Sequence, residues 1–134
     1  MADRRKLEVS LVTPNGPAFE GDAELIIVPG QAGEIGVLAR HAPLIATLNA
    51  GSTRIYTDWD ADTVEEFATG PGFFQVLNDR AIALVDDAVQ SSQVNAARAR
   101  EQLEAIERGE SAGDRWQIEQ RIKHAENQLA VAGR

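Results

Sequence analysis

The sequence predicts a β-sandwich domain followed by an α-helical hairpin, two parts that are separate along the chain. Two changes of pattern carry this prediction. Residues 7 to 85 hold a series of short apolar runs bounded by Gly, Pro, Asn or Asp, which is typical of antiparallel sheets. From residue 93 onward the apolar residues recur every three or four positions, as they do in amphipathic helices. We therefore predict a sandwich over residues 1–88 and a hairpin over residues 89–134.

The expected strands follow one another at short intervals. Leu7, Val9 and Leu11 alternate with polar residues, and the turn residues at 13–17 end this run. Further strands are expected at 23–28, 35–38, 45–48, 54–59, 64–68, 73–77 and 81–85.

Two connections between these strands have the composition of hairpin tips, namely Asn78-Asp79 and the acidic run at 58–62. Between them lie the adjacent rings of Phe73 and Phe74. Side chains alternate between the two faces of a strand, so at least one ring should enter the core. The other ring is a candidate for a binding surface.

The first helix is expected over residues 93–108. Its apolar stripe is short and rich in alanine, with Ser91 or Ser92 as the cap and Gly109 where a helix usually ends. The stripe consists of Ala96, Ala99, Leu103 and Ile106.

The second helix is expected to begin at Asp114, which stands three residues before Gln117 in the spacing of a capping box. Its stripe consists of Ile118, Ile122, Ala125, Leu129 and Ala132. Both stripes are narrow, and two short helices alone would be marginally stable in water. The hairpin should therefore dock on the sandwich or on a partner, and a weakly docked element can also leave its place.

Charge and composition exclude several classes of protein. The net charge is −8, and the excess of acidic residues lies in the first 90 positions. A negative surface repels a phosphate backbone, so we expect no nucleic-acid binding. The chain lacks cysteine and lacks a run long and apolar enough to cross a bilayer, so we expect neither a zinc-thiolate site nor direct membrane insertion.

Residues 29–51 invite a search for a ligand site because they combine several glycines with His41. Gly30, Gly33 and Gly36 do not have the spacing of a dinucleotide or P-loop motif, which would also run into a helix. The only other histidine is His124, which we expect on the solvated face of the second helix. His41 is expected to order a turn or to face a partner, and we predict no metal site.

The acidic residues around the 58–62 hairpin leave two alternatives to a solvated tip. Asp58, Asp60 and Asp62 have the spacing of a calcium loop, but the glycine and glutamate of that loop are missing. The same carboxylates with Glu65 and Glu66 could form an acid/base pair in a hydrolase with a concave acidic pocket. No serine lies in a nucleophile elbow. The residues alone thus favour a non-catalytic subunit or adaptor.

The segment LEVSLVTPNGPAFEGDAELIIVPGQAGEIGVLARHAPLIATLNAG, with GPGFFQVLNDRAIALVDDA further on, resembles the epsilon subunit of F-type ATP synthases. The resemblance covers the whole chain, and its specificity comes from the order of several short motifs. They are Thr13-Pro14, Phe19-Glu20-Gly21, Pro29-Gly30, Gly33-Glu34-Ile35-Gly36, His41-Ala42-Pro43-Leu44 and Leu48-Asn49-Ala50-Gly51.

The resemblance implies a non-catalytic subunit of the central stalk, without a cofactor, that couples rotation of the c ring to the gamma subunit. In that family the sandwich binds gamma and the c ring. The loop flanked by Gly33 and Gly36 would present Glu34 to the ring, and His41 and Pro43 would lie near both partners. The complex is expected on the cytoplasmic face of a membrane, with a bacterial or plastid-encoded chain favoured.

The hairpin departs from the family's nucleotide-binding pattern. Where some bacterial relatives have Ile-Asp-x-x-Arg-Ala, this chain has Val94-Asn95-Ala96-Ala97-Arg98-Ala99. Asn95 replaces the aspartate, and Arg98 is left as the main cation, so ATP binding is expected to be weak or absent. The resemblance also allows an extended hairpin to contact the catalytic alpha/beta hexamer and inhibit ATP hydrolysis. The alternative is a sandwich and hairpin adaptor that works outside the ATP synthase.

Overall fold

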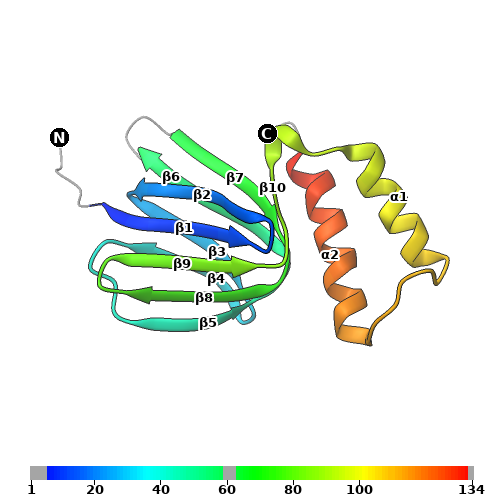
Figure 1. Ribbon diagram of the computed structural model, residues 1–134, viewed down its shortest axis with the longest axis horizontal. Coiled ribbons are helices and arrows are strands. Elements are labelled where there is room, and N and C mark those ends of the chain that lie inside the picture. Colours follow the sequence, from blue (N-terminus) through cyan, green and yellow to red (C-terminus); the bar gives the residue numbers. More distant parts are fainter. Residues whose placement is uncertain (1–5, 59–62, 133–134) are drawn as a thin grey trace.

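The computed structural model describes residues 6–58 and 63–132 (Figure 1). Ten strands precede a short 3-10 helix and two α-helices. The strands are β1 (Leu7–Thr13), β2 (Gly16–Ala23), β3 (Leu25–Gly30), β4 (Gly33–Leu38), β5 (Leu44–Leu48), β6 (Gly51–Asp58), β7 (Thr63–Thr69), β8 (Gly72–Leu77), β9 (Arg80–Val85) and β10 (Ala88–Gln90). The helices are η1 (Ser91–Gln93), α1 (Ala96–Glu107) and α2 (Arg115–Val131).

The strands form one hydrogen-bonded sheet that folds over into two layers. One layer has the order β4-β3-β6-β7-β10, and the other has the order β5-β8-β9-β1-β2. The layers meet where Gly30 of β3 pairs with Leu48 of β5. Neighbouring strands are antiparallel except β1 and β9, which run parallel. The predicted sandwich is confirmed.

The core lies between the layers and is built from alternate residues of the strands. Phe74 is completely buried there, while Phe73 is 61% exposed on the outer face, as the alternation predicted. Each large apolar side chain that is fully buried contributes about 1.5–3 kcal/mol. The largest are Phe74, Leu7, Leu11, Ile26, Leu48 and Ile55.

Two strands were missing from the prediction. Residues 16–23, from which only a turn at 13–17 was expected, form β2, and β10 follows the predicted end of the sheet. Pro17, Gly21 and several acidic residues made β2 look like a loop. A strand at the edge of a sheet tolerates proline and charge because one of its sides pairs with no neighbour, and β2 is an edge strand.

The predicted hairpin tip at Asn78-Asp79 is confirmed. Both residues have positive φ values, 51° and 59°, and they connect β8 to the antiparallel β9. This is the conformation of the tight turn that matches the twist of two paired strands. In the other acidic connection, β6 pairs with β7, but residues 59–62 lie outside the described part, including Trp59, Asp60 and Asp62.

The helical hairpin forms as predicted, with one change of cap. The expected caps Ser91 and Ser92 lie instead in η1, and α1 begins after Asn95, whose Oδ1 accepts from the Arg98 N–H at 3.1 Å. The first helix is therefore shorter than expected. The chain leaves α1 through Gly109, with φ of 78°, and the Glu110 N–H donates to the Ala105 carbonyl, which is a Schellman motif.

The start of α2 is the capping box that the spacing predicted. Asp114 Oδ1 accepts from the Gln117 N–H at 2.8 Å, and the Gln117 side chain accepts from the Asp114 N–H at 2.9 Å. In Figure 1 α2 stands between the sandwich and α1, and it contacts β6 and β7. The hairpin is thus docked on its own sandwich through α2.

Candidate functional site

Glu34 does not lie in a loop, as the sequence interpretation had it. It is the second residue of β4, directly after the turn at Gln31 and Ala32, and Gly36 lies within the same strand. Gly33 has φ of 135°, a conformation that L side chains rarely adopt, so this glycine is required by the backbone. An added Cβ at Gly36 would make only ordinary contacts, the nearest at 3.9 Å.

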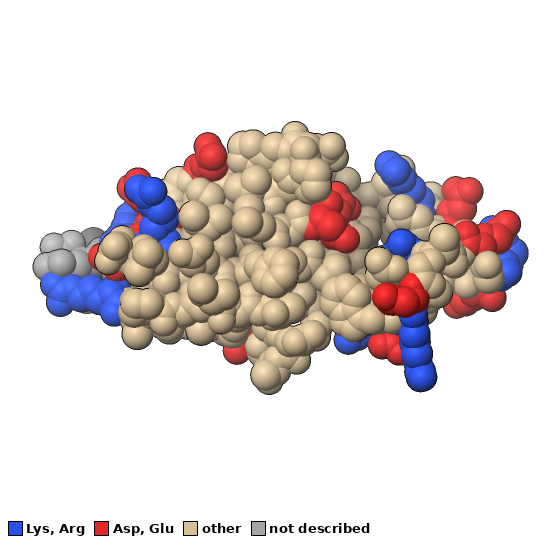
Figure 2. All heavy atoms as spheres, turned by 60° about the horizontal axis from the view of Figure 1, so that its bottom comes forward, with Lys and Arg blue, Asp and Glu red and all other residues tan. Residues whose placement is uncertain are grey.

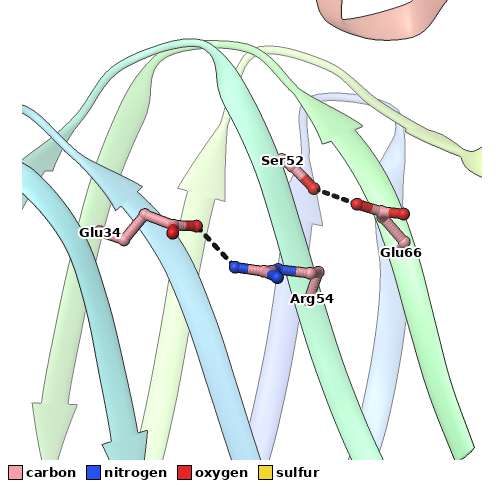
Figure 3. A network of polar contacts seen from close by, with 4 residues as sticks. All are labelled: Glu34, Ser52, Arg54 and Glu66. Atoms are coloured by element: carbon pink, nitrogen blue, oxygen red, sulfur yellow. Dashed lines mark hydrogen bonds and ion pairs between the residues drawn. The ribbon is translucent and has the colours of Figure 1, made fainter. Parts of the chain in front are cut away.

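The carboxylate of Glu34 pairs with Arg54 of β6 across the intervening strand β3. Arg54 Nη2 donates to Glu34 Oε2 at 2.7 Å, and Figure 3 shows the two side chains pointing toward each other. The Glu34 side chain is 61% exposed and that of Arg54 is 32% exposed. Beside them Ser52 donates to Glu66 Oε2 at 2.6 Å. A residue 20 positions away therefore fixes the direction of Glu34.

His41 and Pro43 lie in the connection between β4 and β5, at the opposite end of β4 from Glu34. His41 Nδ1 donates to the Ala42 carbonyl at 2.6 Å, so this histidine orders the turn as expected. Arg40 has a positive φ of 66°, and its N–H donates to the Asp79 carboxylate in the β8–β9 turn. The two turns are thereby joined at one end of the sandwich.

A row of large apolar side chains covers the outer face of β5, β8 and β9, and we call it the apolar face. Phe73 stands opposite Leu84 of β9, and Gln75 stands between Ile45 and Ile82. No other described element covers these residues: Ile45 is 77% exposed, Phe73 61% and Leu84 52%. The apolar face consists of Ile45, Phe73, Leu77, Ile82 and Leu84.

Charged side chains stand around this region and leave its centre free. Figure 2 shows a broad area without Lys, Arg, Asp or Glu over the strands at the lower edge of the sandwich in Figure 1. At its end toward the β8–β9 turn, Arg80 pairs with Glu8 at 3.0 Å. Exposed apolar side chains around an uncharged polar residue, here Gln75, with charges at the rim, are typical of a protein–protein contact surface.

The face of α2 that meets the sandwich is polar, and we call this contact the docking seam. Gln120 is 3% exposed, and its Oε1 accepts from the buried Ala50 N–H at 2.7 Å. Its Nε2 lies 3.4 Å from Asn49 Oδ1. Two polar contacts with the end of the sheet thus come from one side chain of α2.

His124 belongs to the docking seam, which corrects its predicted place on a solvated helix face. Its Nε2 donates to Asp87 Oδ2 at 2.8 Å, and its side chain is 14% exposed. The other ring nitrogen, Nδ1, is buried without a partner. The prediction was wrong because it used only the apolar stripe of α2. Polar residues also recur every four positions, at Gln120, His124 and Gln128, and these share a second face of the helix.

In the docking seam, the pKa values of the neighbouring Asp86 and Asp87 shift in opposite directions. The hydrogen bond from His124 lowers the pKa of Asp87 below its ordinary value, against an opposing effect of burial. Burial raises the pKa of Asp86, which lies beside Asp87 and faces His124 and Arg121. Asp86 also lies so close to Gly70 that a Cβ there would be 1.7 Å from its Oδ1.

The Asn95 side chain is engaged in the folded hairpin, whereas the Arg98 side chain is exposed. Asn95 caps α1 by accepting from the Arg98 backbone, and the Arg98 guanidinium lies near enough to lower the pKa of Asp87. Arg121, on the facing helix, donates to Ser111 Oγ at 2.8 Å and to the Ala112 carbonyl in the connecting loop. The Arg121 guanidinium therefore holds the loop that connects α1 to α2.

Of the acidic residues considered for catalysis, Glu65 and Glu66 have separate partners. Glu65 accepts from Gln90 Nε2 at 3.2 Å, whereas Glu66 accepts from Ser52 on the opposite side of β7. Over residues 6–58 and 63–132, no three His, Asp or Glu side chains converge as metal ligands. Within the same residues no helix is long and apolar enough to cross a membrane.

These features define a small β-sandwich that carries a docked helical hairpin and a free apolar face. Comparison with known proteins makes the definition specific. The sequence model of the beta-sandwich domain of the ATP synthase delta/epsilon chain matches residues 6–91. The chain belongs to this family.

Curated relatives extend the match over the hairpin. The ATP synthase epsilon chain of Halalkalibacterium halodurans is 35% identical, with 96% of this chain and 98% of the relative covered. That of Shouchella clausii is 33% identical, with 94% of each covered.

Solved structures share the fold at low sequence identity. A chain of the Euglena gracilis mitochondrial ATP synthase, described as OSCP/F1/c-ring, superposes with a TM-score of 0.75 at 18% identity, covering 97% of this chain and 85% of that one. A chain of the Tetrahymena thermophila mitochondrial enzyme, described as central stalk/c-ring, gives 0.60 at 16% identity, covering 97% and 96%.

Proposed function

We propose that this chain is the epsilon-type rotor subunit of an F-type ATP synthase, which links the gamma subunit to the c ring and makes no bond itself. The family membership supports a place in the ATP synthase complex, and the free apolar face supports the role of linking the chain to a partner subunit. A sheet layer whose outer positions are apolar needs a covering partner. In the assembled enzyme the chain would sit at the membrane surface on the cytoplasmic side, most naturally in a bacterium.

The apolar face is the proposed gamma contact. Its aromatic side chain, Phe73, is 61% exposed and stands opposite Leu84 of β9. Aromatic side chains near the centre of an interface contribute a large share of the binding energy, about 2 kcal/mol or more each. Gamma should therefore present an apolar surface with basic or polar residues at its rim, because the sandwich is acidic.

Co-purification of tagged chain with gamma tests this contact. Phe73→Asp should abolish the recovery of gamma, since a carboxylate would then be buried without a partner. Leu38→Asp is the matched control, because Leu38 is 47% exposed on β4, in the other layer. Equal recovery of gamma with both variants contradicts the proposed contact, whereas no recovery of gamma with the unmodified chain favours an adaptor outside the ATP synthase.

The end of the sandwich formed by the β3–β4 turn is the proposed c-ring contact. Gly33 lets the turn form and Glu34 offers an exposed carboxylate beside it, whereas His41 and Pro43 lie at the opposite end of β4 and do not belong to this contact. The polar loops of a c ring offer hydrogen-bond donors to such a carboxylate. Proton-driven ATP synthesis in membrane vesicles should fall with Glu34→Ala; unchanged synthesis with unchanged assembly removes Glu34 from this role.

We also propose that the hairpin, from residue 91 onward, can leave the docking seam and inhibit ATP hydrolysis by contact with the alpha/beta hexamer. The seam supports this because Gln120, His124 and Gln128 bring polar groups that water can satisfy after release. A chain that ends at Gln90 keeps β10 and should raise the hydrolysis rate of the complex. An unchanged rate means that the hairpin does not inhibit.

Binding of ATP by the hairpin is proposed to be weak or absent, and no cofactor is required. Asn95 is occupied as a helix cap, and the exposed Arg98 is a single cation, which is a poor site for a triphosphate. Titration calorimetry of the isolated chain with ATP tests this: saturable binding at sub-millimolar concentration contradicts it.

A further inference from the structure

The ion pair between Arg54 and Glu34 joins strands that are not neighbours in the sheet. β3 lies between β4 and β6, so the Arg54 side chain must extend over β3 to reach the carboxylate. Ile27 of β3 is the register partner of both Arg54 and Gly36. Gly36 presents no side chain on this outer face. The outer face of the layer therefore leaves room for the guanidinium to pass.

Arg54 is held more firmly than an ordinary surface arginine. Its side chain is only 32% exposed, and its Nε atom is buried without a hydrogen-bond partner among the described residues, so Nη2 makes the bond to Glu34. Glu66 stands directly opposite it on β7. With its stem buried along the sheet, Arg54 loses little further freedom when it forms the pair with Glu34.

Only one oxygen of Glu34 is used by the described part of the chain. Oε2 accepts from Arg54, whereas Oε1 forms no hydrogen bond with the described residues. A carboxylate oxygen has two lone pairs, so Oε1 can accept from a donor on a partner while Oε2 stays bound. The arrangement orders the carboxylate before any partner arrives, and such preorganisation lowers the entropy cost of binding.

We propose that Arg54 is a positioning residue for the rotor contact: it holds Glu34 in one orientation and leaves Oε1 for a hydrogen-bond donor of the c-ring loop. This inference rests on the proposed contact between Glu34 and the ring. Immobilising one long side chain typically costs about 0.5–1.5 kcal/mol, so losing the preorganisation should weaken ring binding about two- to tenfold.

The test measures binding of the gamma-bound chain to detergent-solubilised c ring by biolayer interferometry. Arg54→Gln should weaken binding about two- to tenfold, and Arg54→Lys, which keeps the cation, should restore most of it. Arg108→Gln is the matched control, because Arg108 forms an ion pair of the same length, 2.7 Å, with Glu110 in the hairpin. Thermal unfolding of each variant separates loss of positioning from loss of fold.

A double-mutant cycle decides whether Arg54 acts through Glu34. In a Glu34→Gln background, Arg54→Gln should have no further effect on ring binding. Additive losses of ring affinity in the double variant overturn the positioning role. Weak binding by Glu34→Gln together with normal binding by Arg54→Gln overturns it as well. Both outcomes leave the Glu34 contact in place. Normal binding by Glu34→Gln overturns the contact itself and the inference with it.

Discussion

Replacing Gln120 with Leu should weaken the docking of the hairpin. Gln120 Oε1 is the acceptor for the Ala50 N–H at 2.7 Å in a place where both residues are buried. Leucine fills similar space but leaves this N–H without an acceptor, which costs about 1–3 kcal/mol. The ratio of docked to undocked hairpin should therefore fall by a factor of about 5 to 150.

Amide hydrogen exchange followed by NMR is the appropriate assay, because it reports on the Ala50 N–H itself. The Ala50 amide should exchange faster in Gln120→Leu by the same factor, while amides in the middle of β8 and β9 keep their protection. Gln128→Leu is the control, since Gln128 is 8% exposed on the same helix and forms no hydrogen bond with another described residue. Unchanged exchange at Ala50, or equal acceleration in both variants, refutes the reasoning.

Three further predictions concern acid stability and two glycines. The hydrogen bond from His124 lowers the pKa of Asp87, so its stabilising effect is complete above the ordinary carboxyl pKa and is lost as the pH falls through the lowered value. The free energy of unfolding in urea, measured between about pH 2 and pH 6, should depend less on pH for Asp87→Asn than for the unmodified chain. An identical pH dependence of the two proteins contradicts this. Gly70→Ala places a Cβ 1.7 Å from Asp86 Oδ1 and should cost about 1–3 kcal/mol in urea unfolding; a neutral result means that Asp86 moves away freely. Gly33→Ala forces a side chain onto a backbone with φ of 135° and should cost about 1–3 kcal/mol, measured by thermal unfolding, unless the β3–β4 turn changes conformation.

Local patterns were sufficient for most of the fold. Alternation along the strands, the turn residues Asn78-Asp79 and the capping box at Asp114 each depend on groups a few positions apart, and all three are confirmed. The edge strand β2 was missed because proline, glycine and charge usually indicate a loop. The sheet order is needed to show that its outer side pairs with no other described strand.

The contact surfaces were less accessible to sequence reasoning. The ion pair between Arg54 and Glu34 and the hydrogen bond between Gln120 and Ala50 connect positions far apart in the sequence. No local spacing predicts such contacts. The apolar face did leave a signal. Residues 81–85 are apolar at every position, which indicates a strand covered on both faces, yet Leu84 is 52% exposed. An uninterrupted apolar run in a strand with one free face indicates a covering partner.

The junction between the two layers determines how the sandwich would carry a mechanical load. Near the β3–β4 turn, Gly30 pairs with Leu48, the Gln31 N–H donates to Thr47, and the Asn49 N–H donates to Pro29. A force applied at Glu34 thus enters β3 and β5 together and reaches the apolar face along β5 and β8 as well as through the core. Since close-packed interiors are stiff, the sandwich would transmit torque with little elastic delay, and a cavity in its core would make the rotor more compliant.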